Sequence, residues 1–175
     1  MNGSLVYLKG NIFSSPAEVI VNPVNVFGVM GKGLAAEFKR RYPAMFKRYK
    51  KFCDNKSFSV GQLFISREAD YSVLLFPTKK HWRGGSKLEY VEAGLKKFVD
   101  TYGQKGINSI AFPKLGCGYG GLKWEDVRPL MEKYLRELPI DIYVYLDNEQ
   151  DLNKTAVVTL GTDFTVEGVL DGLKK

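Results

Sequence analysis

A short segment rich in cations and aromatic rings holds the groups best suited to chemistry in this sequence. It reads Thr78-Lys79-Lys80-His81-Trp82-Arg83. A lysine that lies near other cations has a lowered pKa, and its neutral amine is a nucleophile. Neutralising an ordinary lysine, with a pKa of about 10.4, costs about 4 kcal/mol near pH 7.4, and neighbouring positive charge reduces this cost. From local sequence alone, the segment is either such a reactive site or an ordinary solvated basic loop.

Two glycine-dense segments lie on either side of this basic segment in the sequence, and each follows a short apolar run. The first contains Asn22-Pro23-Val24-Asn25 and Gly31-Lys32-Gly33, and the second is Leu115-Gly116-Cys117-Gly118-Tyr119-Gly120-Gly121. Glycine lets backbone N–H groups approach a ligand closely, and a following helix adds the positive end of its dipole. The two segments therefore predict a cradle for a diphosphate. The first of them matches neither the dinucleotide-binding fingerprint nor the P-loop.

Four residues of the glycine-dense and basic segments could have a functional or a structural role. The amides of Asn22 and Asn25 donate and accept at once, which suits a ribose diol, although asparagine beside proline is also a common turn former. Cys117 is expected to be a small apolar filler. His81 is the single histidine, and it either carries a proton or makes a stacking or hydrogen-bonding contact.

Apolar runs typical of strands alternate with helical patterns along the chain. We expect strands over residues 5–8, 19–21, 62–66, 72–76, 109–112 and 140–146, and helices over 33–42, 44–52, 87–102 and 124–138. Ser86 is expected to cap the third helix. The alternation predicts a mixed, mainly parallel sheet with helices on both faces and a ligand at the carboxyl ends of the strands. Beyond residue 146, an edge strand over 156–160 and a short helix over 166–173 are expected.

Length and composition exclude several classes of protein. The chain has 175 residues, of which 45% are hydrophobic and 13% aromatic, so it fits one domain with a real core and is not a disordered chain. No apolar run approaches the roughly 20 residues that span a bilayer, and no signal peptide is expected. Cys53 and Cys117 are the only cysteines, which predicts a reducing cytosol without disulfides. Two cysteines and one histidine do not make an ordinary zinc site.

The charge balance favours a polyanionic partner. The net charge is +7 and the isoelectric point is near 9.3. Cations are dense over residues 39–51, where Tyr42, Phe46 and Tyr49 are interleaved with them. Such a region either holds a nucleic-acid backbone or forms a solvated face whose aromatic residues belong to the core.

Four motifs in this order resemble the macrodomain family. They are Ala17-Glu18-Val19-Ile20-Val21-Asn22-Pro23-Val24-Asn25, Gly28-Val29-Met30-Gly31-Lys32-Gly33-Leu34-Ala35, Phe76-Pro77-Thr78-Lys79-Lys80-His81-Trp82-Arg83 and Pro113-Lys114-Leu115-Gly116-Cys117-Gly118. Within this family, the chain is most similar to the DarG-type macrodomains, which are related to the terminal ADP-ribose protein glycohydrolase. The resemblance implies a three-layer α/β/α sandwich with a central mixed, mainly parallel sheet over residues 1–146. The resemblance does not cover residues 147–175, which we expect to be a C-terminal extension packed on the same domain.

The resemblance also implies a site for ADP-ribose. Asn11 and Ile12 would meet the adenine, whereas Asn22 and Asn25 would lie beside the distal ribose, with Asn22 also catalytic. Lys79 would be the catalytic lysine, and Lys80 would replace it if the register shifts by one. The other ligand-binding residues would be Gly31, Lys32, Gly33, Thr78, Leu115, Gly116, Cys117, Gly118, Tyr119 and Gly120. His81, Trp82 and Arg83 would contact nucleic acid, and no metal or cofactor is expected.

The DarG-type branch removes ADP-ribose that a DarT toxin attaches to thymidine in single-stranded DNA. The resemblance therefore implies a cytoplasmic, antitoxin-like DNA ADP-ribosyl glycohydrolase. Its expected partners are ADP-ribose, ADP-ribosylated single-stranded DNA and a DarT-like toxin, without a membrane. The alternatives are a hydrolase of protein acyl-ester ADP-ribose, a hydrolase of ADP-ribose-1″-phosphate, and a binding module without activity.

Two positions depart from the family pattern. Asn11 stands where most macrodomains have aspartate, and an amide can still bond adenine. Gly120 stands where the protein-deglycosylating relative has an acid. Because glycine cannot donate a proton, this departure gives a nucleobase substrate more weight than a protein ester.

Overall fold

The computed structural model describes residues 3–146, and the expected domain extension, strand and helix beyond them lie outside the described residues. Within the described part, one sheet has the strand order β1-β6-β5-β2-β4-β3. Its strands are β1 (Ser4–Lys9), β2 (Val19–Asn25), β3 (Phe64–Arg67), β4 (Ser72–Lys79), β5 (Ser109–Phe112) and β6 (Asp141–Leu146). β3 is antiparallel to β4, and the other neighbours are parallel. The expected mixed, mainly parallel sheet is confirmed.

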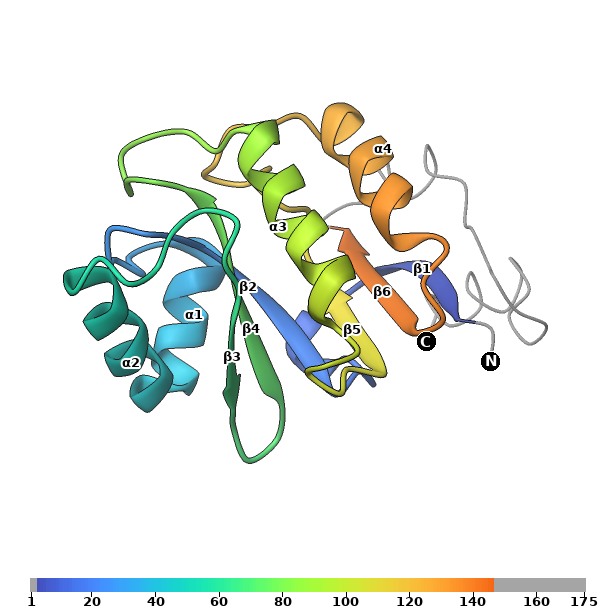
Figure 1. Ribbon diagram of the computed structural model, residues 1–175, viewed down its shortest axis with the longest axis horizontal. Coiled ribbons are helices and arrows are strands. Elements are labelled where there is room, and N and C mark those ends of the chain that lie inside the picture. Colours follow the sequence, from blue (N-terminus) through green and yellow to red (C-terminus); the bar gives the residue numbers. More distant parts are fainter. Residues whose placement is uncertain (1–2, 147–175) are drawn as a thin grey trace.

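Helices cover both faces of this sheet (Figure 1). They are α1 (Gly33–Arg41), α2 (Pro43–Asp54), α3 (Leu88–Thr101) and α4 (Trp124–Leu135), with a short 3₁₀ turn, η1 (Ile12–Ser14). Successive side chains of β2 and β4 point to opposite faces. Val21 and Phe76 therefore pack with α3 and α4, whereas Ile20 and Leu75 pack with α1 and α2. The result is the α/β/α sandwich that was expected.

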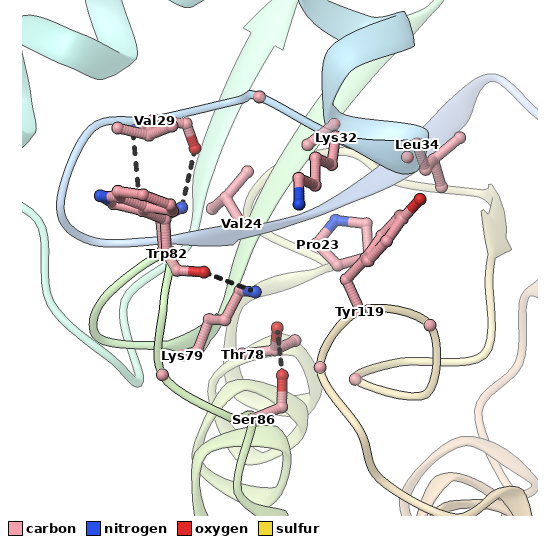
Figure 2. Close-up of a pocket in the computed structure, with 18 of the residues that line it drawn as sticks. Pro23, Val24, Val29, Lys32, Leu34, Thr78, Lys79, Trp82, Ser86 and Tyr119 are labelled. Carbon is pink, nitrogen blue, oxygen red and sulfur yellow. Dashed lines mark hydrogen bonds between the residues drawn. The ribbon is translucent and has the colours of Figure 1, made fainter.

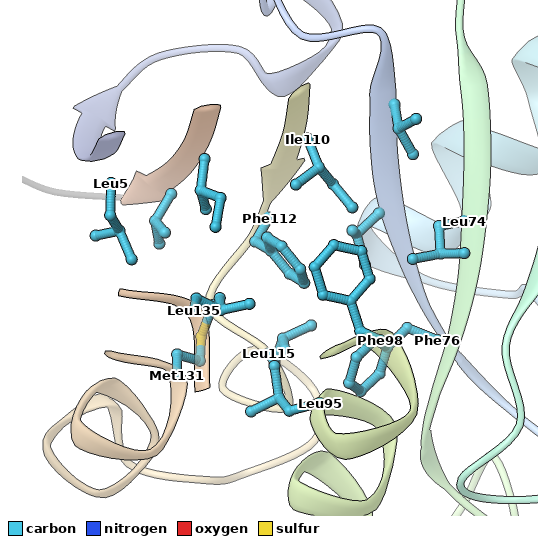
Figure 3. Close-up of a cluster of buried hydrophobic side chains, with 14 of the residues drawn as sticks. Leu5, Leu74, Phe76, Leu95, Phe98, Ile110, Phe112, Leu115, Met131 and Leu135 are labelled. Atoms are coloured by element: carbon cyan, nitrogen blue, oxygen red, sulfur yellow. The ribbon is translucent and has the colours of Figure 1, made fainter. Parts of the chain in front are cut away.

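An apolar stripe on α3 holds this helix against the sheet. Val91, Leu95 and Phe98 recur at helical spacing and are fully buried. The ring of Phe98 meets that of Phe112 on β5 edge-on, with 5.6 Å between the centroids. This packing is visible in Figure 3, where Leu95 and Phe98 face Phe112 and Leu115. The stripe fixes the position of the loop that enters α3.

Strand pairing extends the two central strands beyond their apolar runs. β2 continues to Asn25 and β4 continues to Lys79, because the two strands pair in parallel along almost their whole length. The asparagines and the lysine that were expected in loops therefore lie on strands. The expectation that Ser86 caps α3 is wrong, because the cap residue is Lys87, without a side-chain bond. The hydroxyl of Ser86 donates instead to Oγ1 of Thr78 at 3.2 Å.

Several cations of α1 and α2 have local acidic partners. Glu37 accepts hydrogen bonds from Arg40 and Arg41, which hold its pKa at about 2. Lys50 pairs with Asp54 at 2.8 Å. Phe38, Tyr42 and Tyr49 are buried in the core below, so these helices fit the solvated-face interpretation. In the described part of the chain, no helix is long and apolar enough to cross a membrane, and no cluster of histidine, cysteine and acidic residues could hold a metal ion.

Gly94 sets how closely α3 approaches β4, and its replacement by alanine should destabilise the fold. A Cβ at this position would overlap the ring of Phe76, which is itself fully buried. Overpacking of this kind costs about 1–3 kcal/mol, more than the gain of up to about 1 kcal/mol from helix propensity. Urea titration of Gly94→Ala should give a lowered midpoint. Gly103→Ala is the matched control, since a Cβ there meets open space; equal midpoints would contradict this packing.

Candidate functional site

A cavity of about 770 Å³ opens where β2, β4 and β5 end. Three loops form it, namely those that follow each of these strands (Figure 2). The expected site residues that line it are Asn25, Gly31, Lys32, Gly33, Thr78, Lys79, Trp82, Arg83, Gly116, Gly118, Tyr119 and Gly120. No acidic side chain is among the lining residues, whereas Lys32, Lys79, Arg83 and Lys114 are. The cavity is therefore suited to an anion.

A bulge at the end of β4 brings Thr78 and Lys79 to the cavity together. Val24 pairs with Pro77 and Asn25 pairs with Lys79, so Thr78 is one extra residue on β4. In a regular strand, neighbouring side chains would point to opposite faces, and a bulge changes this alternation. The carbonyl of Lys79 still accepts from the N–H of Val26 at 3.2 Å, which ties the bulge to the loop after β2.

Lys79 brings an amine with a lowered pKa to the cavity. Its Nζ lies 3.4 Å from the carbonyl oxygen of Trp82, to which it donates. Burial lowers the pKa of Lys79, and the positive charge of Lys32 lowers it further. Lys80 does not line the cavity, and its Nζ lies 5.4 Å from the centre of the Tyr90 ring. Of the two candidate lysines, the structure thus brings Lys79 to the cavity.

Asn25 organises the loop after β2 through its own amide. Its Oδ1 accepts from the N–H groups of Phe27, Gly28 and Val29 at 3.0–3.3 Å. Its Nδ2 donates to the carbonyl of Val29 at 2.7 Å. The hydroxyl of Tyr49 on α2 lies 2.9 Å from the same Oδ1. These contacts use one of the two N–H groups of the Asn25 amide. The side chain therefore holds the loop in shape, and its second N–H can bond to a ligand in the cavity.

The N-terminus of α1 opens into the cavity without a cap. Lys32 is the cap residue and makes no side-chain cap bond, and the first turn contains no acidic residue. The first N–H groups of a helix lack partners within it and carry the positive end of the dipole. Gly33, Leu34 and Ala35 of this turn all line the cavity. Backbone donors and one lysine thus converge on a single wall.

The loop after β5 closes the opposite wall. Its turns are held by bonds from the N–H groups of Cys117, Gly121 and Leu122 to carbonyls within the loop. The carbonyl of Gly120 accepts from the N–H of Ser86, which joins this loop to the start of α3. A Cβ at Gly120 would collide with Oγ of Ser86 and with the Gly116 carbonyl, so this position accommodates no side chain.

A smaller hollow adjoins the cavity beyond α1. Asn11 and Ile12 line it, and Leu34 and Pro113 are shared by both spaces. Oδ1 of Asn11 caps η1 by accepting from the N–H of Phe13 at 2.9 Å. The two residues expected at the adenine thus lie next to the cavity and outside it.

Four of the expected site residues do not line either space. Asn22 is fully buried below the loop, where its Nδ2 contacts Sδ of Met30 at 3.7 Å and its Oδ1 has no protein partner. Leu115 is buried in the core, Sγ of Cys117 lies 3.5 Å from the carbonyl of Leu115, and His81 lies outside. Lining residues that sequence reasoning did not single out are Pro23, Val24, Val29, Leu34, Ala35, Gly84, Ser86, Pro113 and Lys114. Several of them lie within the four macrodomain-like motifs, and their place in these motifs is the sequence feature that could have identified them.

The sequence matches a known protein family and several characterised proteins. The family model for the Macro domain matches residues 21–131. The DNA ADP-ribosyl glycohydrolase of Mycobacterium tuberculosis is 41% identical over 146 residues, which cover 81% of this chain and 42% of that protein. A fusion of a DNA ADP-ribosyl transferase with a DNA ADP-ribosyl glycohydrolase, from Thermosipho africanus, is 36% identical over 84% of this chain and 43% of its own length. The chain thus spans about two fifths of the length of these relatives.

Solved structures show the same fold. The macrodomain of Mycobacterium tuberculosis DarG superposes with a TM-score of 0.80, at 41% identity, and the match covers 83% of this chain and 99% of that one. Thermosipho africanus DarTG in complex with ADP-ribose gives a TM-score of 0.79 at 34% identity, covering 85% of this chain and 44% of that one. The matched region contains the loops that form the cavity. This chain belongs to the macrodomain family.

Proposed function

We propose that this chain is a DNA ADP-ribosyl glycohydrolase. It binds ADP-ribose in the cavity and cleaves the N-glycosidic bond that joins the distal ribose to a thymine in single-stranded DNA. The observation that carries the proposal is Lys79, a lysine with a lowered pKa that faces the same space as an uncapped helix N-terminus. The names of the relatives from Mycobacterium tuberculosis and Thermosipho africanus support the same activity.

The diphosphate is assigned to the wall formed by Lys32 and the first turn of α1. Free N–H groups, the helix dipole and a lysine together suit a phosphate. The adenine then extends into the smaller hollow beside Asn11 and Ile12, which shares a wall with the cavity. This orientation leaves the distal ribose at the end of the cavity where Lys79 lies. The relative bound to ADP-ribose supports the ligand assignment.

Lys79 acts at the anomeric carbon C1″ of the distal ribose. The lone pair of its neutral amine forms a bond to C1″, while the bond from C1″ to the base nitrogen breaks and its electrons stay on the base. The proton that Nζ loses passes to the base, which leaves as unmodified thymine in the strand. Water then adds to C1″ and releases the lysine amine and ADP-ribose. Holding the diphosphate positions C1″ for attack, which supplies part of the rate acceleration.

Gly120 opposes a mechanism that depends on a second acid from the loop after β5. A side chain at this position collides with Ser86 and with the backbone of Gly116. A base that takes its proton from Nζ of Lys79 does not need that acid. The proposal extends to an antitoxin-like role opposite a DarT-type transferase in the cytoplasm, and the fusion of both activities in the Thermosipho africanus relative supports this pairing.

Lys79→Gln should abolish hydrolysis of ADP-ribosylated single-stranded DNA. Removing a nucleophile typically costs several orders of magnitude in kcat, and we expect a loss of at least about 1,000-fold. Lys80→Gln is the matched control for kcat at saturating substrate, because Lys80 faces Tyr90 outside the cavity. Turnover is measured by release of label, and folding by circular dichroism. A well-folded Lys79→Gln protein with wild-type turnover would exclude this mechanism.

The pH dependence of kcat/KM should reveal the lowered pKa of Lys79. The neutral amine is the active form, so kcat/KM should rise with pH and then level off. The midpoint of this rise should lie below about 10.4, the ordinary pKa of lysine. Lys32→Gln removes a charge that favours the neutral form, and its midpoint should move to higher pH. Lys80→Gln should keep the wild-type midpoint. A midpoint that is the same in all three proteins would contradict the coupling between Lys32 and Lys79.

A comparison of three substrates tests which type of ADP-ribose linkage the protein hydrolyses. The protein is incubated with ADP-ribosylated single-stranded DNA, with a protein that carries ester-linked ADP-ribose, and with ADP-ribose-1″-phosphate. The DNA should lose its label with the highest kcat/KM. Preferential hydrolysis of either other substrate would overturn the assignment to DNA, and no hydrolysis of any substrate would leave a binding module.

A further inference from the structure

A row of exposed planar groups borders the cavity on the side of Lys79. We call Phe27, His81, Trp82 and Arg83 the aromatic ledge. The rings of Phe27 and His81 lie 4.4 Å apart, and those of His81 and Trp82 lie 5.6 Å apart with an interplanar angle of 24°. The Arg83 guanidinium lies 4.5 Å from the centre of the Trp82 ring. Each group is thus in contact with the next.

Core packing does not account for these rings. Phe27 is 52% exposed and Trp82 is 39% exposed, and neither belongs to a core cluster. Two different loops bring them together, since Phe27 follows β2 and Trp82 follows β4. Exposed aromatic rings that are held side by side on a rigid scaffold are typical of binding surfaces.

Hydrogen bonds within the protein hold both loops in place. The N–H of Phe27 donates to Oδ1 of Asn25, so the strand end that shapes the first loop also orients this ring. The N–H of Arg83 donates to Nδ1 of His81 at 3.1 Å, which fixes the imidazole within the second loop. The ledge is therefore preorganised, and stacking on it costs little ordering entropy.

The ledge begins where the leaving group of the proposed reaction emerges. Trp82 and Arg83 line the cavity, while Phe27 and His81 lie beyond it. Nζ of Lys79 bonds to the Trp82 carbonyl, which places the reactive amine and the ledge on one short segment (Figure 2). A chain attached to the distal ribose thus passes from Lys79 onto the rings.

The loop that carries His81, Trp82 and Arg83 is rich in cations. Residues 78–88 contain Lys79, Lys80, Arg83 and Lys87 and no acidic residue. Nζ of Lys80 and Nζ of Lys87 lie 5.4 and 5.5 Å from the centre of the Tyr90 ring, beside the start of α3. Aromatic rings that lie beside cations match the bases and phosphates of a single strand.

We propose that the aromatic ledge binds the nucleotides that flank the modified base, with their bases stacked on Phe27, His81 and Trp82. This inference rests on the proposed function, and it names the part of the substrate beyond ADP-ribose. It assigns the enzyme a preference for a modified base within a strand over the same base as a free nucleoside.

The test compares two substrates that share one scissile bond, namely ADP-ribosyl-thymidine and a single-stranded oligonucleotide that carries it internally. The wild-type protein should show a higher kcat/KM on the oligonucleotide. Phe27→Ala should lower the ratio of the two values about tenfold, as expected for the loss of one stacked base. Phe27→Trp should restore the ratio. Leu88→Ala is the matched control, because Leu88 is 38% exposed and lies outside both the cavity and the ledge.

Binding of free ADP-ribose, measured by calorimetry, reports whether each variant keeps an intact cavity. His81→Ala provides a second ledge variant and should lower the same ratio. Equal kcat/KM on both substrates, or a wild-type ratio in Phe27→Ala and His81→Ala, would overturn the ledge while leaving the proposed function standing. A ratio lowered equally by Leu88→Ala would overturn it as well. Failure to cleave either substrate would instead overturn the proposed function.

Discussion

The pairing of β2 with β4 is the constraint on which the site depends. Asn25 stands opposite Lys79 in this pair, and a single extra residue, Thr78, shifts the register there. The shift turns the lysine toward the cavity, while Asn25 folds the neighbouring loop around its amide. One local irregularity between two buried strands therefore places the Lys79 amine, the first loop and the Phe27 ring relative to one another.

Much of the fold could be predicted because it follows from periodicity. The stripe of Val91, Leu95 and Phe98 and the apolar runs of the strands define which faces meet, and the alternation of elements defines the sheet type. The ends of β2 and β4 could not be predicted in this way. Asn22, Asn25 and Lys79 are not strand formers, and they adopt extended backbone because the partner strand satisfies their hydrogen bonds.

Site residues that belong to sequence motifs could be predicted. Residues whose position depends on contacts between distant segments could not. The glycine loops and Lys79 do converge on one cavity. The sequence did not reveal that Asn22 is buried below the loop, or that Phe27 is exposed and packs against His81. Both outcomes depend on contacts between segments distant in the chain. Ser86 is a similar case, since its hydroxyl donates a hydrogen bond to Thr78 and does not cap α3.

The cavity also carries an electrostatic cost in the absence of a ligand. Lys32 and Lys79 face the same space, and the positive end of α1 adds to their mutual repulsion. An anion that binds there offsets this repulsion. Part of its binding free energy therefore comes from relief of the repulsion between these positive groups. Burial and the same repulsion lower the pKa of Lys79, so the proposed binding and the proposed chemistry depend on one arrangement of charges.

The close contact at Gly120 limits how this scaffold could change its chemistry in evolution. Since any side chain there would strike Ser86 and the Gly116 backbone, no single substitution can introduce an acid at that point. A lineage that gains one has to move the start of α3 or rebuild the turn first. In this chain, an acid at position 120 and the shape of the loop after β5 therefore have to change together.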